Sequence, residues 1–286
     1  NTKFKYPDCV VTIAKFEKLN AKNTPPERPK GPLDTCLNCK GSGLTATSNF
    51  PLADTKNYPN IAIIGGGIGG VAMAVACLHR GIPFTLYERD EDFDARSQGY
   101  GLTLQQGSRA MAGLGIYSLE AGITSTKHVV HTTDGKIIGE WGIRKWGRSK
   151  EKEAPKRKNI HISRQSLRLA LLEQLGAHSS VKWGHRFLDY KDSKNEGIAL
   201  QFQVKDEIIK SNADLIVGAD GIRSTVRKQL IGEANTPLQY LDCIVILGIC
   251  LLENIKDVAH SLLDSATVFQ TANGHERMYM MPYSTA

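Results

Sequence analysis

The stretch Ile61-Ala62-Ile63-Ile64-Gly65-Gly66-Gly67-Ile68-Gly69-Gly70 decides the fold. Its first four residues form a short, continuous apolar run, which is typical of a central parallel strand buried on both faces. Small and apolar residues follow at helical spacing from Val71 to His79, and a second predicted strand, Phe84 to Tyr87, ends directly before Glu88. The stretch therefore predicts a β-α-β unit of about thirty residues.

The glycines of this unit fit the pattern G-x-G-x-x-G between strand and helix. Gly65 permits the tight turn, Gly67 lets the backbone approach a pyrophosphate, and Gly70 lets the helix pack closely on the strand. With Ile68 and Gly69, the start of the helix supplies free amides and a partial positive charge. The pattern favours dinucleotide binding over the alternative, a purely structural glycine turn.

Glu88 lies eighteen residues beyond Gly70, at the end of the second predicted strand. A carboxylate at this position is placed to bind the hydroxyl groups of a ribose and would repel a ribose phosphate. Strand, helix and acid are thus in register, which strengthens the prediction of a dinucleotide site. The motif alone does not distinguish NAD from FAD.

A second informative segment is ADLIVGADGIRSTVR, residues 213–227. Asp214 to Val217 is predicted to be a buried strand, and Gly221 allows close backbone approach. Asp220 then lies at a strand-to-helix turn, where it can sit beside a bound cofactor. The alternative role for Asp220 is that of the N-cap of a helix from Arg223 to Leu230.

A third segment, HISRQSLRLALL at 161–172, predicts an amphipathic helix. Leu167, Leu171 and Leu175 recur every four residues, and Ser163 is a candidate N-cap. Arg164 at the helix start can pair with a phosphate through its planar guanidinium. The alternative is an ordinary surface arginine.

Together these segments resemble the class A flavoprotein monooxygenases, the group of p-hydroxybenzoate hydroxylase and the tetracycline-inactivating monooxygenases. Residues 213–227 look like that family's DG motif, about 150 residues downstream of the glycine loop. Glu88-Arg89 and the stretch 94–102 are similar to the region where the family's arginine contacts the flavin nucleotide, and Arg164 matches an arginine that reaches FAD. The cofactor-binding residues implied by the glycine motif and the resemblance are Gly65, Gly67, Ile68, Gly69, Gly70, Glu88, Arg89, Arg96, Arg164, Asp220, Gly221 and Arg223.

The resemblance runs from about Tyr58 to the C-terminus and implies an α/β fold. It implies a Rossmann-type, glutathione-reductase-like FAD-binding domain interleaved with an incomplete β-sheet substrate domain. The expected segments are an irregular extension over 1–57, FAD-binding segments over 58–128 and 159–232, and substrate-domain segments over 129–158 and 233–286.

Several strands are expected from local patterns as well. Residues 129–138 predict a hairpin with an Asp-Gly turn, and residues 181–204 predict a strand pair. Further strands are expected at Cys243 to Leu251 and at Arg277 to Pro282. The apolar run from Leu241 to Leu252 is too short to span a membrane, which takes roughly 18 residues, so a buried strand is expected there and no transmembrane segment.

The resemblance implies an FAD-dependent monooxygenase that uses NAD(P)H and O₂. Such an enzyme inserts one oxygen atom into an aromatic or conjugated small molecule through a C4a-hydroperoxyflavin. Because the cofactor does the hard chemistry, no catalytic side chain is assigned. The alternatives are an inactive, truncated FAD-binding remnant and a flavin-dependent reductase or halogenase. The family's later Gly-Asp motif is not found, so the parent protein is expected to continue beyond Ala286.

Cysteines and charges narrow the remaining classes. Cys36 and Cys39 have the spacing of a zinc knuckle, but only Cys9 lies nearby, so a metal-free linker is favoured. The net charge of +7 is mild, and the basic run from Lys145 to Lys158 is interpreted as a solvated loop, not a nucleic-acid site. Six scattered cysteines and the absence of an export signal favour a cytoplasmic location. The oligomeric state is not predicted.

Overall fold

The chain forms two compact units. The smaller comprises residues 1–50 and 109–117, and the larger comprises residues 51–108 and 118–286. The computed structural model describes residues 37–39, 42–47, 49, 51–95, 100–142, 159–176, 181–193 and 197–282.

A parallel sheet of four strands carries the glycine loop in the larger unit. Its strand order is β12 (Leu215–Gly218), β1 (Ile61–Ile64), β2 (Phe84–Tyr87) and β8 (Val181–Lys182). Every residue of β1 is buried, because the sheet is covered on both faces. The predicted β-α-β unit is confirmed.

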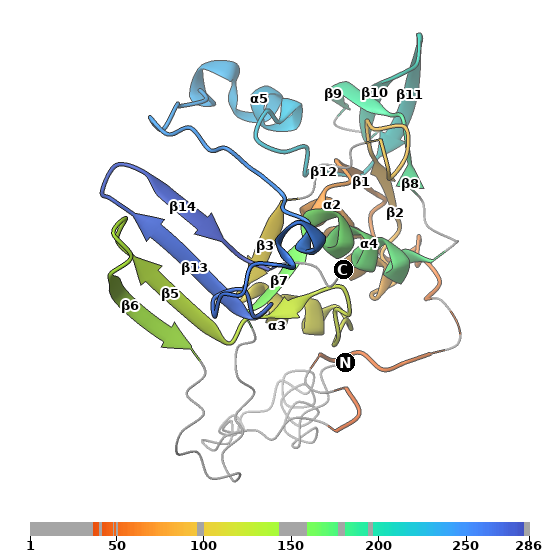
Figure 1. The fold of residues 1–286 in the computed structure, drawn as a ribbon. Coiled ribbons are helices and arrows are strands. Elements are labelled where there is room, and N and C mark those ends of the chain that lie inside the picture. Colours follow the sequence, from red (N-terminus) through yellow and green to blue (C-terminus); the bar gives the residue numbers. More distant parts are fainter. Residues whose placement is uncertain are drawn as a thin grey trace, which may run out of the picture. The chain divides into compact units, whose positions relative to one another are not determined.

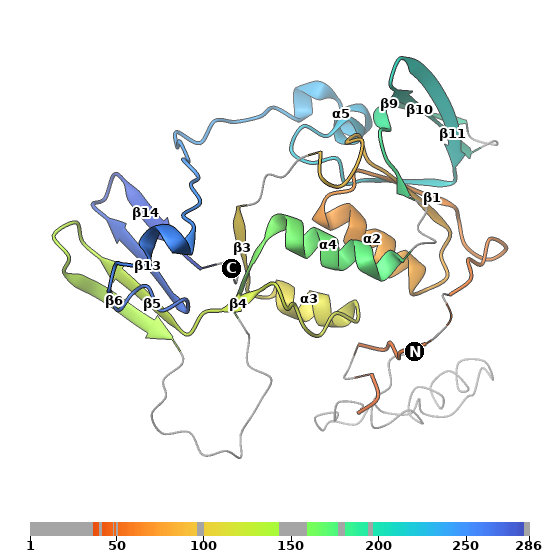
Figure 2. The same ribbon diagram turned by 45° about the vertical axis from the view of Figure 1, so that its right-hand side comes forward.

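Two helices, α2 (Ile68–Leu78) and α4 (Arg164–Leu175), lie side by side against this sheet (Figure 1). The same arrangement is visible after rotation (Figure 2). The predicted leucine stripe of α4 is buried at Leu167, Leu171 and Leu175. Ser163 is its N-cap, and the Ser163 Oγ accepts a hydrogen bond from the amide of Ser166 at 2.9 Å, so the predicted helix start is confirmed.

An antiparallel sheet covers the other face. It consists of β9 (Arg186–Ser193), β10 (Gly197–Val204) and β11 (Glu207–Ala213), in the order β11-β10-β9. Tyr87 of β2 stacks on Phe202 of β10, with ring centroids 4.1 Å apart. Ala62 and Ile64 belong to the same buried cluster, because alternate residues of β1 face opposite sides of the sheet. The predicted strand pair within 181–204 is confirmed as β9 and β10, and β11 is an additional strand.

Two further sheets complete the larger unit. One is antiparallel, with β3 (Gly101–Leu104), β7 (Ile160–Ser163) and β4 (Ile123–Thr124); the other is mixed, with β14 (Arg277–Met280), β13 (Thr267–Ala272), β5 (Lys127–His131) and β6 (Ile137–Gly142). The predicted hairpin is confirmed as β5 and β6, with Gly135 of the Asp-Gly turn at φ +86°. The predicted strand at Arg277 is confirmed as β14.

The prediction of a buried strand at Cys243 to Leu251 is wrong. No strand forms there, and the side chains are exposed, with Ile246 at 91%. Cys243 and Cys250 are exposed too, whereas Cys77 in α2 is buried. An apolar run indicates a preference for burial but does not supply a partner strand. None of the described strands pairs with residues 243–251. In the chain the segment follows α5 (Thr225–Ile231) and the short 3₁₀ helix η1 (Glu233–Asn235). A second 3₁₀ helix, η2 (Leu252–Ile255), comes directly after it.

In the smaller unit the turn at Cys39 is hydrogen-bonded to the segment that follows a helix. The helix α3 (Gly107–Gly113) enters this unit at Arg109. The carbonyl of Cys39 accepts hydrogen bonds from the Ser42 hydroxyl at 2.6 Å and from the Tyr117 hydroxyl at 3.1 Å. Its side chain is buried.

Several of the sequence predictions lie outside the described residues. These are the knuckle cysteines Cys9 and Cys36, the basic run from 145 to 158 and the flavin-contact candidate Arg96. Within the described ranges, no group of three or more His, Cys, Asp or Glu is placed to hold a metal ion. None of the helices that the structure describes is both long and apolar enough to cross a membrane.

Candidate functional site

The glycine loop (residues 65–70) makes a tight turn against the DG segment (residues 213–227). Gly65 has a φ of +107°, which L-residues rarely adopt. A Cβ atom at Gly65 would lie 2.4 Å from the carbonyl oxygen of Ala219 and 2.9 Å from the Cα of Asp220. Both the backbone angle and the close approach therefore require glycine. The contact brings two segments together that are far apart in the sequence.

The N-terminus of α2 is open. Its N-cap is Gly67, and no side chain caps the first turn. A Cβ atom at Gly67 or at Gly69 would meet nothing within 4 Å, whereas one at Gly70 would lie 1.8 Å from the carbonyl oxygen of Gly65. The helix is thus packed tightly against the turn on one side. On the other side its unbonded amides, beginning with that of Ile68, are accessible to an anion.

The carboxylate of Glu88 faces back into the loop. Its Oε2 accepts a hydrogen bond from the amide of Gly66 at 2.7 Å, and its Oε1 accepts one from the amide of Asp90 at 3.1 Å. The residue is buried at 7% exposure. A carboxylate has about four lone-pair sites, so roughly two remain for other donors.

Arg168 on α4 completes this cluster, and sequence reasoning missed it. Its Nε donates a hydrogen bond to the carbonyl oxygen of Gly66 at 2.7 Å, and its Nη2 lies 3.8 Å from Oε2 of Glu88. A signal was present in the sequence: Arg168 lies on the same helical stripe as Leu171 and Leu175. A charged residue on a buried stripe indicates a buried partner.

The other arginines singled out from the sequence lie elsewhere. Arg164, the first residue of α4, donates from Nη1 to the hydroxyl of Tyr100 at 3.1 Å and lies over its ring. Arg89 is exposed directly after Glu88. Arg223 is exposed after the DG glycine. In the described residues, no hydrogen bond or ion pair joins these three side chains to the loop.

The side chain of Asp220 bonds to the start of the helix that follows it. Its Oδ2 accepts hydrogen bonds from the amides of Thr225 at 2.7 Å and Val226 at 3.2 Å, and its Oδ1 accepts one from the hydroxyl of Ser224. The N-cap of α5 is Ser224, not Asp220, and the helix begins at Thr225, so the N-cap role considered for Asp220 is wrong as stated; Asp220 instead bonds the first-turn amides from four residues before the N-cap. Gly221 has a φ of +84°, and a Cβ atom there would meet nothing within 4 Å.

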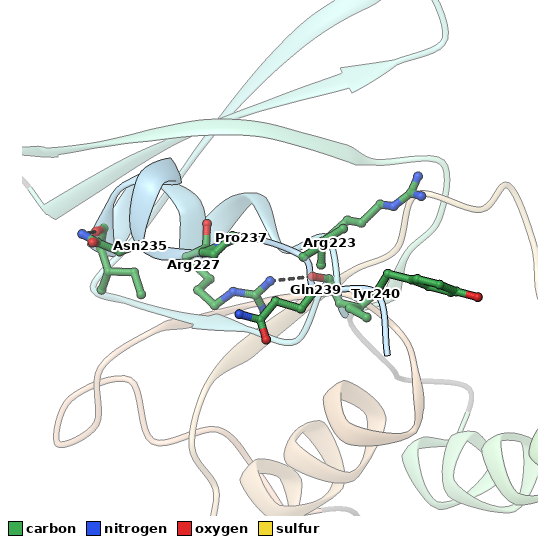
Figure 3. A pocket seen from close by; sticks show the side chains of 10 residues that line it. Arg223, Arg227, Asn235, Pro237, Gln239 and Tyr240 are labelled. Atoms are coloured by element: carbon green, nitrogen blue, oxygen red, sulfur yellow. Dashed lines mark hydrogen bonds between the residues drawn. The ribbon is translucent and has the colours of Figure 1, made fainter. Parts of the chain in front are cut away.

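A pocket of about 700 Å³ lies beside α5 (Figure 3). Arg223 and Arg227 line it together with the chain from Asn235 to Tyr240. Nη2 of Arg227 donates a hydrogen bond to the carbonyl oxygen of Ile222, whereas the side chain of Arg223 extends away from Arg227 (Figure 3). None of the lining residues belongs to the glycine loop, so this pocket does not coincide with the loop.

A buried histidine lies between β3 and β4. The Nδ1 of His161 is 2.9 Å from the Thr103 hydroxyl, and its Nε2 has no hydrogen-bond partner among the residues that are described. Burial, reinforced by the nearby His128, lowers the pKa of His161 to about 4. His128 in turn stacks on Trp141. The His161 imidazole is therefore neutral at physiological pH.

Comparisons with known proteins find a family model and several relatives that match this chain. Residues 58–283 match the model of a family described as FAD binding domain. The zeaxanthin epoxidase of Oryza sativa subsp. japonica is 29% identical over 194 residues, which are 65% of this chain and 28% of that protein. The 6-methylsalicylate 1-monooxygenase of Aspergillus terreus is 25% identical over 221 residues, which are 74% of this chain and 48% of that protein.

A solved structure shows the same fold. Klebsiella pneumoniae HpxO, complexed with FAD and uric acid, has a TM-score of 0.58 at 20% identity, and the match covers 79% of this chain and 54% of that one. The chain thus spans between about a quarter and a half of the length of the two relatives. These matches confirm the resemblance to flavoprotein monooxygenases and the Rossmann-type α/β fold.

Proposed function

Because the chain belongs to the FAD binding domain family, we propose that its glycine loop binds FAD. The pyrophosphate would lie at the N-terminus of α2, and Glu88 would accept hydrogen bonds from the adenosine ribose. The observation that carries this proposal is the uncapped helix start, where Gly67 leaves open space beside a buried carboxylate. Backbone amides and the helix dipole favour a phosphate there.

Further cofactor contacts are proposed for other residues of this chain. The amides of Ile68, Gly69 and Gly70 would donate to the pyrophosphate. Asp220 and Gly221 would lie near the cofactor, because Gly65 packs against the DG segment. Arg89, Arg96, Arg164 and Arg223 are proposed as further contacts from the family resemblance alone.

For the whole protein we propose an FAD-dependent monooxygenase that acts on an aromatic or conjugated small molecule. When bound, FAD supplies the redox chemistry, taking a hydride from NAD(P)H and activating O₂. The protein's own residues bind and orient the cofactor and exclude water. The printed names of the relatives, an epoxidase and a monooxygenase, support this class. A cytoplasmic location is proposed from the free thiols of Cys77, Cys243 and Cys250.

FAD binding is tested by titrating the 286-residue chain and a Gly67→Ala variant. The new methyl group meets no protein atom but projects into the space proposed for the pyrophosphate. Isothermal calorimetry should show at least a roughly tenfold weaker Kd for FAD, equal to about 1.4 kcal/mol, after correction for the folded fraction. Gly113→Ala is the matched control, because its methyl group also enters open space, at the end of α3. Equal FAD affinity in both variants would overturn the assignment of the site.

The activity is tested by following NADH and NADPH oxidation by the FAD-loaded protein across a panel of phenols, aromatic acids and conjugated compounds. Mass spectrometry of the product under heavy-isotope O₂ should show incorporation of one labelled oxygen atom. Product without label, or oxidation that does not depend on any panel compound, would exclude a monooxygenase.

A further inference from the structure

We infer that Arg168 is a positioning residue that holds the glycine loop and Glu88 in the arrangement needed for the adenosine-diphosphate half of FAD. This inference rests on the proposed function. It concerns a residue outside the glycine and DG motifs, and it assigns Arg168 an indirect role, through Gly66 and Glu88. The ligand class is an adenosine diphosphate with a free ribose diol.

Gly66 is held from both sides. Its N–H donates to Oε2 of Glu88, and its carbonyl accepts from Nε of Arg168, both at 2.7 Å. These groups belong to two consecutive peptide planes. Glycine peptides rotate easily, so without such bonds the loop would sample several orientations. The two ionised side chains therefore fix the middle of the loop.

The bond from Arg168 also sets the direction of the next amide. The carbonyl of Gly66 and the N–H of Gly67 share one trans peptide, in which they point in opposite directions. Because the carbonyl points at Arg168, the Gly67 N–H points away from it. Gly67 is exposed and is the N-cap of α2. Its amide therefore points from the buried guanidinium towards the open start of the helix.

The guanidinium itself is firmly placed. Arg168 is 7% exposed and lies over the rings of Phe93 and Trp183, with its Cζ 5.3 and 5.2 Å from their centroids. Both rings favour a planar cation. A buried ion pair as a whole can often be replaced by apolar residues of similar size without loss of stability, whereas removal of one partner alone leaves the other charge unpaired and is costly. Stability alone thus gives little reason for a charged pair at this position.

The ion pair leaves Glu88 able to bind a ligand. Nη2 of Arg168 is 3.8 Å from Oε2 of Glu88, and this buried nitrogen has no hydrogen-bond partner in the part of the chain that the structure describes. Arg168 therefore compensates the charge of Glu88 without occupying a lone pair. The acceptor sites not used by the amides of Gly66 and Asp90 remain for the two ribose hydroxyls.

The test compares Arg168→Gln and Arg168→Lys with Leu175→Ala. Leu175 is buried near the other end of the same helix, so its truncation matches a general loss of stability without touching the loop. Calorimetric titration with FAD, and separately with ADP, should show Kd values for Arg168→Gln raised at least about tenfold, and those for Leu175→Ala unchanged after correction for the folded fraction. Arg168→Lys should be intermediate, because it keeps the charge and loses the planar fork.

A double-mutant cycle distinguishes positioning from packing. In a Glu88→Gln background, Arg168→Gln should weaken FAD binding far less than it does in the wild type, because the two residues act through one arrangement. Additive losses would overturn the inference, as would a Kd for Arg168→Gln within about twofold of the wild type. If Arg168→Gln does not fold, Arg168→Lys takes its place in the cycle, and a Kd for Arg168→Lys within about twofold of the wild type, or additive losses, would overturn the inference.

Amide hydrogen exchange separates this inference from the proposed function. A wild-type chain that binds neither FAD nor ADP would refute the proposed function. Exchange at the Gly66 amide in the ligand-free chain would then decide the role of Arg168. It should be faster in the Arg168 variants than in Leu175→Ala, and equal rates would refute the inference.

Discussion

Two neighbouring glycines of the cofactor loop are expected to respond to alanine with opposite signs. At Gly70 the new Cβ would lie 1.8 Å from the carbonyl oxygen of Gly65 and 3.2 Å from the Cβ of Ala219. Ordinary contact is about 3.5 Å, so α2 and the loop would have to separate by roughly 1.7 Å. The opposing atom is backbone and cannot rotate away. We expect a loss of about 3 kcal/mol, the upper end of the range for overpacking.

At Gly69 the same methyl group enters open space, and no positive φ restrains the residue. Alanine is favoured over glycine in a helix by about 0.5–1 kcal/mol. Gly69→Ala should therefore stabilise the chain slightly, and the two variants should differ by roughly 3–4 kcal/mol.

Urea unfolding, followed by far-UV circular dichroism and tryptophan fluorescence, measures this difference. The midpoint should move down for Gly70→Ala and slightly up for Gly69→Ala, with an unchanged m-value. The reasoning fails if Gly70→Ala costs less than about 1 kcal/mol, or if both variants lose similar stability. Either result would mean that the helix is not packed against the turn as described.

Two further predictions concern protonation and thiol reactivity. Stability should fall as the pH drops from about 6.5 to about 4, because the unfolded chain takes up a proton at His161 before the folded chain does. The loss is on the order of 3 kcal/mol, His128 adds to it in the same direction, and urea midpoints for His161→Gln should show a shallower pH dependence. Iodoacetamide should label Cys243 and Cys250, which are exposed, faster than Cys77, since burial also raises the pKa of the Cys77 thiol. Site-resolved mass spectrometry checks this order, and equal labelling of the three thiols would contradict it.

Local patterns predicted the parts of the fold that depend on local chemistry. The Ile61 to Ile64 run, the glycines that follow it and the Ser163 cap each act within one or two turns of chain, and all three form as expected. The prediction of a buried strand from Cys243 to Leu251 is wrong because it depends on a distant part of the chain. Whether an apolar run becomes a strand depends on a neighbouring strand elsewhere in the sequence.

In the candidate site, too, local features could be predicted from the sequence and long-range contacts could not. The glycine motif predicts the tight turn at Gly65. The contact of Gly65 with Ala219 depends on the pairing of β1 with β12, which the motif does not specify. Arg164 stood out because it begins a helix, whereas Arg168, one turn later, makes the contacts with the loop. A cation within a leucine stripe indicates a buried partner, although the sequence alone does not say which residue that partner is.

The pairing of β1 with β12 has a consequence for the order of folding during synthesis. β1 is flanked by β2, which follows within one β-α-β unit, and by β12, which begins at Leu215. The hydrogen bond from the Asn60 amide to Asp214 at this junction joins residues 154 positions apart. The emerging chain must therefore keep one edge of β1 unpaired until β12 leaves the ribosome. At synthesis rates of about 5–20 residues per second, that wait is on the order of ten seconds. During this interval an apolar strand edge is exposed, and a chaperone that covers it should raise the yield of folded protein.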